Sequence, residues 1–135
     1  MQKRPPDVYR IQFGISQLGP ALDYIATHYA TEISLERLAR LCGISLTHFR
    51  RQFREILGKS PHRYLLELRV QAAAAAMRDV RKRISEAAFD VGFSTLSTFN
   101  RAFRDVLGEA PRTWRSSRHS TRNPNLGRTK PTQNH

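Results

Sequence analysis

The sequence contains little that would suit a secreted or membrane-spanning protein. Cys42 is the only cysteine among 135 residues, so no disulfide bond can form within the chain. No apolar run approaches the roughly 20 residues that a membrane-spanning helix needs. The chain starts with MQKRPP, which lacks the apolar stretch of a secretory signal. We therefore expect no disulfide framework, no membrane span and no signal peptide.

Residue patterns typical of catalysis are also missing. The five histidines show no metal-ligand spacing with one another or with Cys42. There is no glycine-rich phosphate loop, and neither a Ser-His-Asp set nor a pair of carboxylates stands out. We therefore expect that the protein is not an enzyme and has no catalytic residue, metal or cofactor. Cys42 is interpreted as a small core residue beside a turn, with a reactive thiol as the alternative.

Acidic residues are few, so the charge of the chain is strongly positive. Eleven acidic residues stand against 23 basic ones, which gives a formal charge of +12, and 19 of the basic residues are arginine. Arginine is favoured where phosphate oxygens or base edges are bound, because its planar guanidinium presents a fork of donors. This balance indicates a nucleic acid, a membrane surface or an acidic protein as partner, without choosing among them.

The most regular pattern that is present lies in residues 84–115. Apolar residues at helical spacing predict a short helix over 84–91. Gly92 then suits a turn with positive φ, and Ser94 or Thr95 can cap a second helix. A glycine and a proline further on mark the end of that helix and the start of a third. Two short helices joined by a tight glycine turn form a helix-turn-helix.

The first half of the chain repeats this unit. When the sequence is shifted by fifty residues, eight positions of a short window carry identical residues, and Tyr64 meets Trp114. Upstream the shift becomes 49, so Gly43 meets Gly92 and the one-residue difference lies in the turn. Such repetition predicts two copies of one helical unit. The identical pairs are Leu46 and Leu96, Phe49 and Phe99, Arg51 and Arg101, Phe53 and Phe103, Arg54 and Arg104, Leu57 and Leu107, Gly58 and Gly108, and Pro61 and Pro111.

Apolar stripes and capping residues place the other helices. Serine is a good N-cap, and proline suits the first turn of a helix. Five consecutive alanines, Ala72 to Ala76, favour a stiff helix with small side chains. The expected helices are Leu18 to Tyr29, Leu35 to Leu41 capped by Ser34, Leu46 to Leu57 capped by Ser45, and a long helix from Ser60 and Pro61 to about Asp79.

The tandem unit resembles the DNA-binding domain of the AraC/XylS family of bacterial transcription regulators. The resemblance covers roughly Leu18 to Arg115 and is carried most strongly by the second copy. Trp114 stands where the family often has Tyr, and both are large aromatics with a polar tip. The matching residues of the second copy are Ile84, Ala87, Val91, Gly92, Phe93, Ser97, Phe99, Arg101, Phe103, Gly108, Pro111 and Arg115.

The resemblance implies an all-α fold of about seven helices, with tandem helix-turn-helix subdomains joined by a long linker helix. We expect a flexible basic arm over 1–16, the first helix-turn-helix unit over 17–60, the linker helix over 61–79, the second unit over 80–116 and a disordered basic tail over 117–135. The tail has a single aliphatic residue and no acid, so it cannot form a core. Arm and tail either add attraction to DNA or are passive.

DNA recognition by such a unit requires that its second helix enters the major groove with its early outward residues at base edges. Arg can bind guanine and Asn adenine through two hydrogen bonds, and Thr or Leu can contact a thymine methyl. The alternative for each side chain is a solvated or phosphate-facing position, and for the two leucines the edge of the core. The candidate DNA-binding residues are Leu46, Thr47, Arg50, Arg51 and Arg54 in the first unit, and Leu96, Ser97, Asn100, Arg101 and Arg104 in the second.

Helix starts and one further arginine are additional candidates. The free N–H groups at the helix starts near Ser34, Ser45, Ile84 and Ser94 can anchor phosphates or be capped locally. Arg69 matches a recurrent arginine in the linker helix of the family. We interpret Arg69 as part of an internal ion pair, with phosphate binding as the alternative.

By resemblance, the chain is a sequence-specific transcription regulator that binds double-stranded DNA in the bacterial cytoplasm. The resemblance favours activation through RNA polymerase over repression. One alternative is a protein-interaction module that acts on a regulator or on RNA polymerase without reading DNA. Another is a nonspecific nucleic-acid packager or an RNA binder. Arginines on both recognition helices favour DNA.

Only about 17 residues precede the first expected helix, so we expect no separate effector domain in this chain. The chain is then either a stand-alone regulator or a fragment of a longer one. We expect a monomer that binds its DNA site without a small molecule. The recognition helices would lie about 34 Å apart, on an asymmetric site of about 20 bp.

Overall fold

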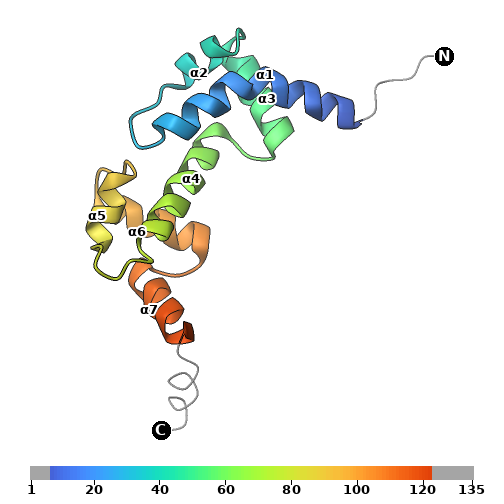
Figure 1. Ribbon diagram of the computed structural model, residues 1–135. Helices are drawn as coiled ribbons and strands as arrows, with labels where there is room; N and C mark the ends of the chain where they lie inside the picture. The colour runs from blue at the N-terminus through green and yellow to red at the C-terminus, as the bar shows by residue number, and fades with distance from the viewer. Residues whose placement is uncertain (1–6, 123–135) are drawn as a thin grey trace, which may run out of the picture. The chain divides into compact units, whose positions relative to one another are not determined.

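The computed structural model describes residues 7–122, with side-chain environments over 12–118. This part of the chain contains seven helices and no strand, as Figure 1 shows. The prediction of an all-α fold with about seven helices is therefore confirmed. The helices are α1 (Asp7–His28), α2 (Leu35–Leu41), α3 (Leu46–Leu57), α4 (Pro61–Ala76), α5 (Ile84–Asp90), α6 (Leu96–Leu107) and α7 (Pro111–Arg122).

The chain divides into two compact units, Met1–Arg69 (unit 1) and Val70–His135 (unit 2). The division falls inside α4, so the first part of this helix belongs to unit 1 and its alanine-rich part to unit 2. Unit 1 contains the helix pair α2 and α3, and unit 2 contains the pair α5 and α6. Each unit therefore carries one of the two predicted helix-turn-helix pairs.

Helix α1 is longer than the sequence indicated. It begins at Asp7, whereas a flexible arm was expected over 1–16 and the first helix from Leu18. The expected arm is therefore wrong from residue 7 onward, and residues 1–6 lie outside the described part. Glycine is a poor helix former and hid the pattern in this stretch. Gly14 lies in the part of α1 that was not predicted, residues 7–17.

Tertiary contacts hold this extension of α1 against α3. Gly14 is buried, and a Cβ atom added to it would lie 2.4 Å from Cδ1 of Ile56. The side chain of Gln52 donates a hydrogen bond to Gln17 at 3.0 Å. The absence of a side chain at Gly14 thus lets α1 approach α3 closely, a use of glycine that propensity does not reveal.

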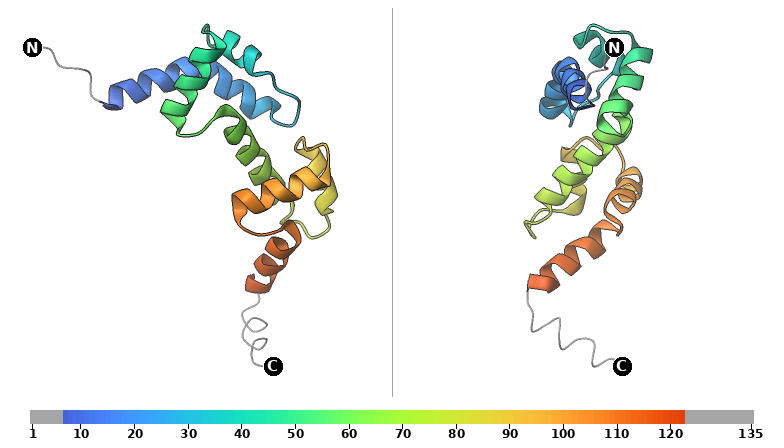
Figure 2. Two further views of the ribbon diagram at one scale, coloured as in Figure 1. Left: turned by 180° about the vertical axis from the view of Figure 1, so that it is seen from behind. Right: turned by 90° about the vertical axis from the view of Figure 1, so that its right-hand side faces the viewer.

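Unit 1 is built around an apolar core between α1, α2 and α3. These three helices contact one another pairwise, and they lie together in both views of Figure 2. Phe49 and Phe53 of α3 are fully buried, and each large side chain buried in this way stabilises the fold by about 1.5–3 kcal/mol. The other buried members of this core are Leu18, Ala21, Ile25, Leu38 and Ala39.

Unit 2 repeats this packing with almost the same geometry. The rings of Phe99 and Phe103 lie 5.4 Å apart at 58°, and those of Phe49 and Phe53 lie 5.5 Å apart at 55°. Phe103 meets Trp114 edge-to-face at 5.6 Å. The counterpart in unit 1 is the contact of Phe53 with Tyr64 at 5.4 Å. The repeat read from the sequence is therefore also a repeat of packing, and Trp114 takes the role of the tyrosine.

The C-terminal helix also extends further than expected. Helix α7 runs to Arg122, so the prediction of a disordered tail from residue 117 is wrong for 117–122. Trp114 anchors the start of α7 in the core, which the polar composition of the following residues did not indicate. The remainder of the predicted tail, 123–135, lies outside the described residues.

Candidate nucleic-acid interface

The two helix-turn-helix turns follow the same design. Gly43 and Gly92 have φ values of 73° and 109°, a region that favours glycine. The next residue in each turn bonds back to the preceding helix: the N–H of Ile44 donates to the carbonyl of Ala39, and that of Phe93 to Ala88, both at 3.1 Å. These bonds fix the direction in which α3 and α6, the candidate recognition helices, start.

Side-chain caps then start both recognition helices. Ser45 accepts a hydrogen bond from the N–H of His48 at 3.1 Å, as predicted. Of the two candidates for α6, Thr95 is the cap, and it accepts from the N–H of Thr98 at 3.1 Å. The first two N–H groups of each helix have no partner within a helix, so they remain suited to phosphate.

The predicted site residues of unit 1 lie along the outward side of α3. The side chains of Thr47, Arg50, Arg51 and Arg54 are exposed, and that of Leu46 is half-buried at the edge of the core. Their spacing places the four exposed residues on one stripe of the helix. Within the described residues, the guanidinium groups on this stripe form no hydrogen bond or ion pair with other side chains.

The predicted site residues of unit 2 come together in one hollow along α6. Leu96, Ser97, Asn100, Arg101 and Arg104 are all exposed, and all five line an open cavity of about 1000 Å³. We call this cavity the α6 hollow. Leu96 is 40% exposed, so its side chain can contact a ligand. The other lining residues are Arg83, Ile84, Ser85, Ala110, Pro111, Arg112, Arg115 and Ser116.

Three arginines of the α6 hollow were not among the predicted site residues. Arg83 precedes α5, and Arg112 and Arg115 lie in the first part of α7. No periodicity within one helix could have revealed them, because they come from both sides of α6 in the sequence. A basic residue just before a helix start and two just after a Pro that opens one were the only local signals.

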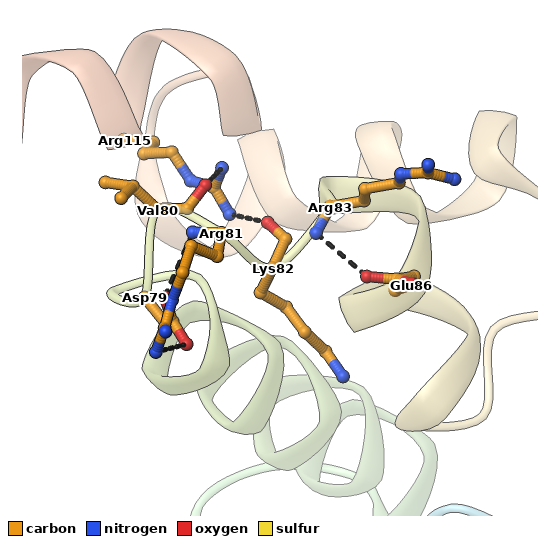
Figure 3. Close-up of polar contacts among 7 residues, drawn as sticks. All are labelled: Asp79, Val80, Arg81, Lys82, Arg83, Glu86 and Arg115. Carbon is orange, nitrogen blue, oxygen red and sulfur yellow. Dashed lines mark hydrogen bonds and ion pairs between the residues drawn. The ribbon is translucent and has the colours of Figure 1, made fainter.

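The electrostatic character of the α6 hollow is uniformly positive. Five arginines line it, and none of its lining residues is acidic. The carboxylates of two nearby residues are engaged elsewhere. Asp90 pairs with Lys82 at 2.7 Å. Glu86 accepts from the backbone N–H of Arg83 at 3.0 Å, as Figure 3 shows. A hollow with this charge and open form suits a polyanion such as a nucleic-acid backbone.

Arg69 has an internal role, but its partners differ from the predicted ion pair. Its Nε donates to the carbonyl of Tyr29 at 2.6 Å, and its Nη2 donates to that of Thr31 at 2.7 Å. Both acceptors are backbone oxygens, so the interpretation as an ion pair is wrong. Burial lowers the pKa of the Arg69 guanidinium.

Cys42 behaves as a structural residue. Its side chain is half-buried, and burial raises the pKa of the thiol, which opposes formation of a reactive thiolate. Among the described residues, no group of three or more His, Cys, Asp or Glu side chains could hold a metal ion.

Comparisons with known proteins agree with this geometry. A helix-turn-helix domain family matches residues 38–117, which is more than half of the chain. A solved AraC-type transcriptional regulator from Chromobacterium violaceum superposes with a TM-score of 0.70 at 27% identity, covering 76% of this chain and 92% of that one. The chain belongs to the AraC/XylS family of DNA-binding proteins. The family prediction is thus confirmed.

Another similar structure was solved in complex with DNA. The DNA-binding domain of the global transcriptional factor AdpA, in complex with a target DNA, superposes with a TM-score of 0.71 at 26% identity. The match covers 80% of this chain and 96% of that domain. The AraC-type domain of our chain is therefore nearly as long as a complete DNA-binding domain of this family.

Curated relatives of the AraC-type chain are longer regulators. The transcriptional activator RhaS of Escherichia coli is 30% identical over 103 residues, which are 76% of this chain and 37% of RhaS. The uncharacterised regulator YdeC of Bacillus subtilis is 31% identical over 78 residues, 58% of this chain and 27% of YdeC. The chain thus matches only 27% to 37% of the length of these relatives.

In the described part of the AraC-type chain, none of the helices is long and apolar enough to cross a bilayer.

Proposed function

We propose that this AraC-type chain binds a specific double-stranded DNA site and regulates transcription, with α3 and α6 inserted into successive major-groove segments. The observation that carries the proposal is the repeated exposed face. Arg51 and Arg54 of α3 have identical counterparts, Arg101 and Arg104, on α6. All four side chains are exposed, although a folded domain of this size offers carboxylates with which they could pair.

The early outward residues of each helix supply the sequence preference. On α3, Arg50 and Arg51 can bind guanine through two hydrogen bonds, and Thr47 can contact a thymine methyl. On α6, Asn100 can pair with adenine, and the exposed Leu96 can contact a thymine methyl. Because the two helices present different side chains, they prefer different half-sites.

Phosphate contacts supply the remaining affinity. Arg83 and Arg112 flank α6 in the α6 hollow, and they can bind the backbone on either side of the groove that α6 enters. The uncapped N–H groups at the helix starts add neutral donors. The formal charge of +12 attracts the chain to DNA of any sequence before it finds its site.

An activating role through RNA polymerase is part of the proposal. RhaS, with which this chain shares 30% identity over 103 residues, is a transcriptional activator. Two exposed aromatic side chains that do not belong to α3 or α6, Phe13 at 68% and Phe89 at 50%, are suited to contact with a protein partner. A reporter assay on the selected promoter, with activation lost on deletion of the chain, tests this role.

Selection of bound sequences from a random DNA pool tests the DNA-binding proposal. We expect one asymmetric site of about 20 bp with two different half-sites, and a footprint on both. A single short contact, or a symmetric site occupied by two copies, would contradict insertion of two recognition helices. No enrichment over the starting pool would favour a nonspecific packager, and no binding to any duplex would favour a protein-interaction module.

A further inference from the structure

Two arginines of the chain donate hydrogen bonds to backbone carbonyls far away in the sequence. Arg69 of α4 and Arg115 of α7 are half-buried, unlike the exposed arginines of α3 and α6. Each follows the recognition helix of its unit, and each donates to backbone carbonyls of a segment that precedes the helix-turn-helix of the same unit. We call these two arrangements the arginine clamps.

The clamp of unit 1 binds the connection between α1 and α2. The guanidinium of Arg69 reaches the carbonyls of Tyr29 and Thr31 at 2.6 and 2.7 Å, nearly 40 residues back along the chain. Both distances are at the short end for hydrogen bonds from a charged donor. This connection leads directly to Ser34, the N-cap of α2.

The clamp of unit 2 binds the connection between α4 and α5. Arg115 donates through Nη2 to the carbonyl of Lys82 at 2.5 Å and through Nη1 to that of Val80 at 3.5 Å. Figure 3 shows the guanidinium of Arg115 directed at this connection, with Arg83 and Glu86 following at the start of α5. The acceptors again are two carbonyls that lie two residues apart.

The acceptors explain why arginine stands at these positions. The four acceptor carbonyls lie beyond the ends of α1 and α4, so they take no part in helical hydrogen bonding and need other partners. The planar fork of arginine can bond two of them at once. An ammonium group has no fixed fork, so lysine would hold the two carbonyls less rigidly.

The arginines of the two clamps do not occupy equivalent positions in the sequence repeat. Shifted by fifty residues, Arg69 matches His119 and Arg115 matches Leu65, so the clamping arginines stand four residues apart in the repeat. Four residues are about one helical turn, which puts both arginines on corresponding faces of α4 and α7. In both units an arginine thus bonds two backbone carbonyls, although it does so from non-equivalent positions. This indicates that the hydrogen bonds themselves are required.

We propose that Arg69 and Arg115 are positioning residues for DNA recognition. Each ties the segment that enters its helix-turn-helix to the helix that leaves it, so that the recognition helix is held between two fixed ends. The angle at which α3 or α6 meets the groove is then set by the clamp, and neither guanidinium is needed at a phosphate. This role rests on the proposed DNA-binding function.

Charge-conserving variants separate a clamp from a phosphate contact. For Arg69→Lys and Arg115→Lys, we expect affinity for the selected site over random DNA to fall by about tenfold, because loosely held reading residues lose discrimination. Affinity for random DNA and its salt slope should stay as in the wild type, since no charge is lost. Arg112→Gln is the matched control on α7: it should weaken binding to both DNAs alike and leave their ratio unchanged.

Hydrogen exchange of the free protein gives a measurement that does not involve DNA. In Arg69→Lys the amides at the start of α2 should exchange faster, and in Arg115→Lys those at the start of α5, whereas Arg112→Gln should change neither. In the wild type, the Nε proton of Arg69 should exchange more slowly than that of the exposed Arg50. This last measurement needs no variant. It therefore shows whether the clamp of unit 1 exists even if a variant fails to fold.

Three results would overturn the clamps. Lysine variants that keep both the preference and the amide protection would show that the carbonyl bonds are dispensable. A glutamine variant of either arginine whose salt slope falls by about 0.9, with affinity restored by lysine, would assign a phosphate contact instead. Equal exchange rates of the Nε protons of Arg69 and Arg50 would show that Arg69 does not bond the carbonyl of Tyr29. Loss of specific binding by the wild-type chain itself would instead contradict the proposed function.

Discussion

At the scale of single residues, arginine serves three different purposes in this chain. Arg51 and Arg101 are exposed on the recognition helices, Arg69 and Arg115 bind backbone carbonyls, and Arg63 pairs with a carboxylate. The sequence could not separate these purposes, because the residue type is the same and only burial and partners differ. The recurrent position of Arg69 in the family was therefore open to two interpretations before the carbonyl partners were known.

Substitution of Arg51 or Arg101 tests the reading faces. If either arginine binds a guanine, its change to Ala should cost about 1–3 kcal/mol of binding free energy and relax the preference at one base position. A binding titration on the selected site and on single-base variants of it measures both effects. If the arginine contacts a phosphate instead, its substitution should weaken binding to all sequences equally. If neither substitution changes the affinity, α3 and α6 do not lie at the DNA interface.

The ion pairs of Glu67 make the stability of unit 1 dependent on pH. Lys59 and Arg63 donate to the Glu67 carboxylate at 2.5 and 2.7 Å and hold its pKa below the ordinary value of 4.5. Because the pKa is lower in the folded state, the pairs stabilise the fold above that ordinary value, and this contribution is lost as the pH falls through the lowered pKa. Both pairs are partly exposed, so we expect at most about 1 kcal/mol.

Urea unfolding of Glu67→Gln measures this contribution. The variant should be less stable than the wild type near neutral pH, and the difference should vanish in acid once the wild-type carboxyl is protonated. Glu55→Gln, on the exposed side of α3, is the control and should show no such convergence. A difference that persists unchanged in acid would assign the effect to packing and not to charge.

At the scale of elements, the glycine turn decides whether a helix pair forms. Gly92 has a φ of 109°, where a side chain strains the backbone by about 1–2 kcal/mol. Gly92→Val should therefore lower the melting temperature and the affinity for the selected site together. Gly19→Ala, inside α1 with no atom within 4 Å of the added Cβ, is the control and should not destabilise the protein. An unchanged melting temperature for Gly92→Val would contradict the turn described above.

Helix boundaries show where local patterns were sufficient. The spans of α2, α3, α5 and α6 follow from apolar spacing, capping serines and terminal glycines, and the structure has them at nearly the predicted residues. The starts of α1 and the end of α7 did not follow, because α1 contains Gly14 and α7 ends in a polar segment. The start of α1 depends on contacts such as the close approach of Gly14 to Ile56, which a local pattern does not contain.

At the scale of the whole molecule, both surfaces proposed to read DNA, the outward sides of α3 and α6, belong to one chain. The outward residues of α3 and α6 differ, with Arg50 in one unit at the position of Asn100 in the other. One chain can therefore bind an asymmetric site without a second copy. These outward residues are exposed, and a small molecule can act on them only if it binds two states of the protein with different affinities.

We expect the purified 135-residue chain to be a monomer that binds the selected site without an added small molecule. Sedimentation at several concentrations gives the oligomeric state, and a titration that monitors the mass of the complex gives the number of chains on each DNA. Two chains on each site, or binding that appears only after a metabolite is added, would contradict this prediction and point to a regulatory contact.

The sequence by itself determined the helical units, their repetition and the family of this protein. Helix stripes, caps and turn glycines act within a few residues, so spacing alone carries them. Only the tertiary structure decided which arginines meet around α6 and which carbonyls Arg69 and Arg115 bind. Arg115 and Lys82 are 33 residues apart in the sequence, and Arg69 and Tyr29 are 40 residues apart. Their meeting depends on how helices pack, which no local pattern specifies.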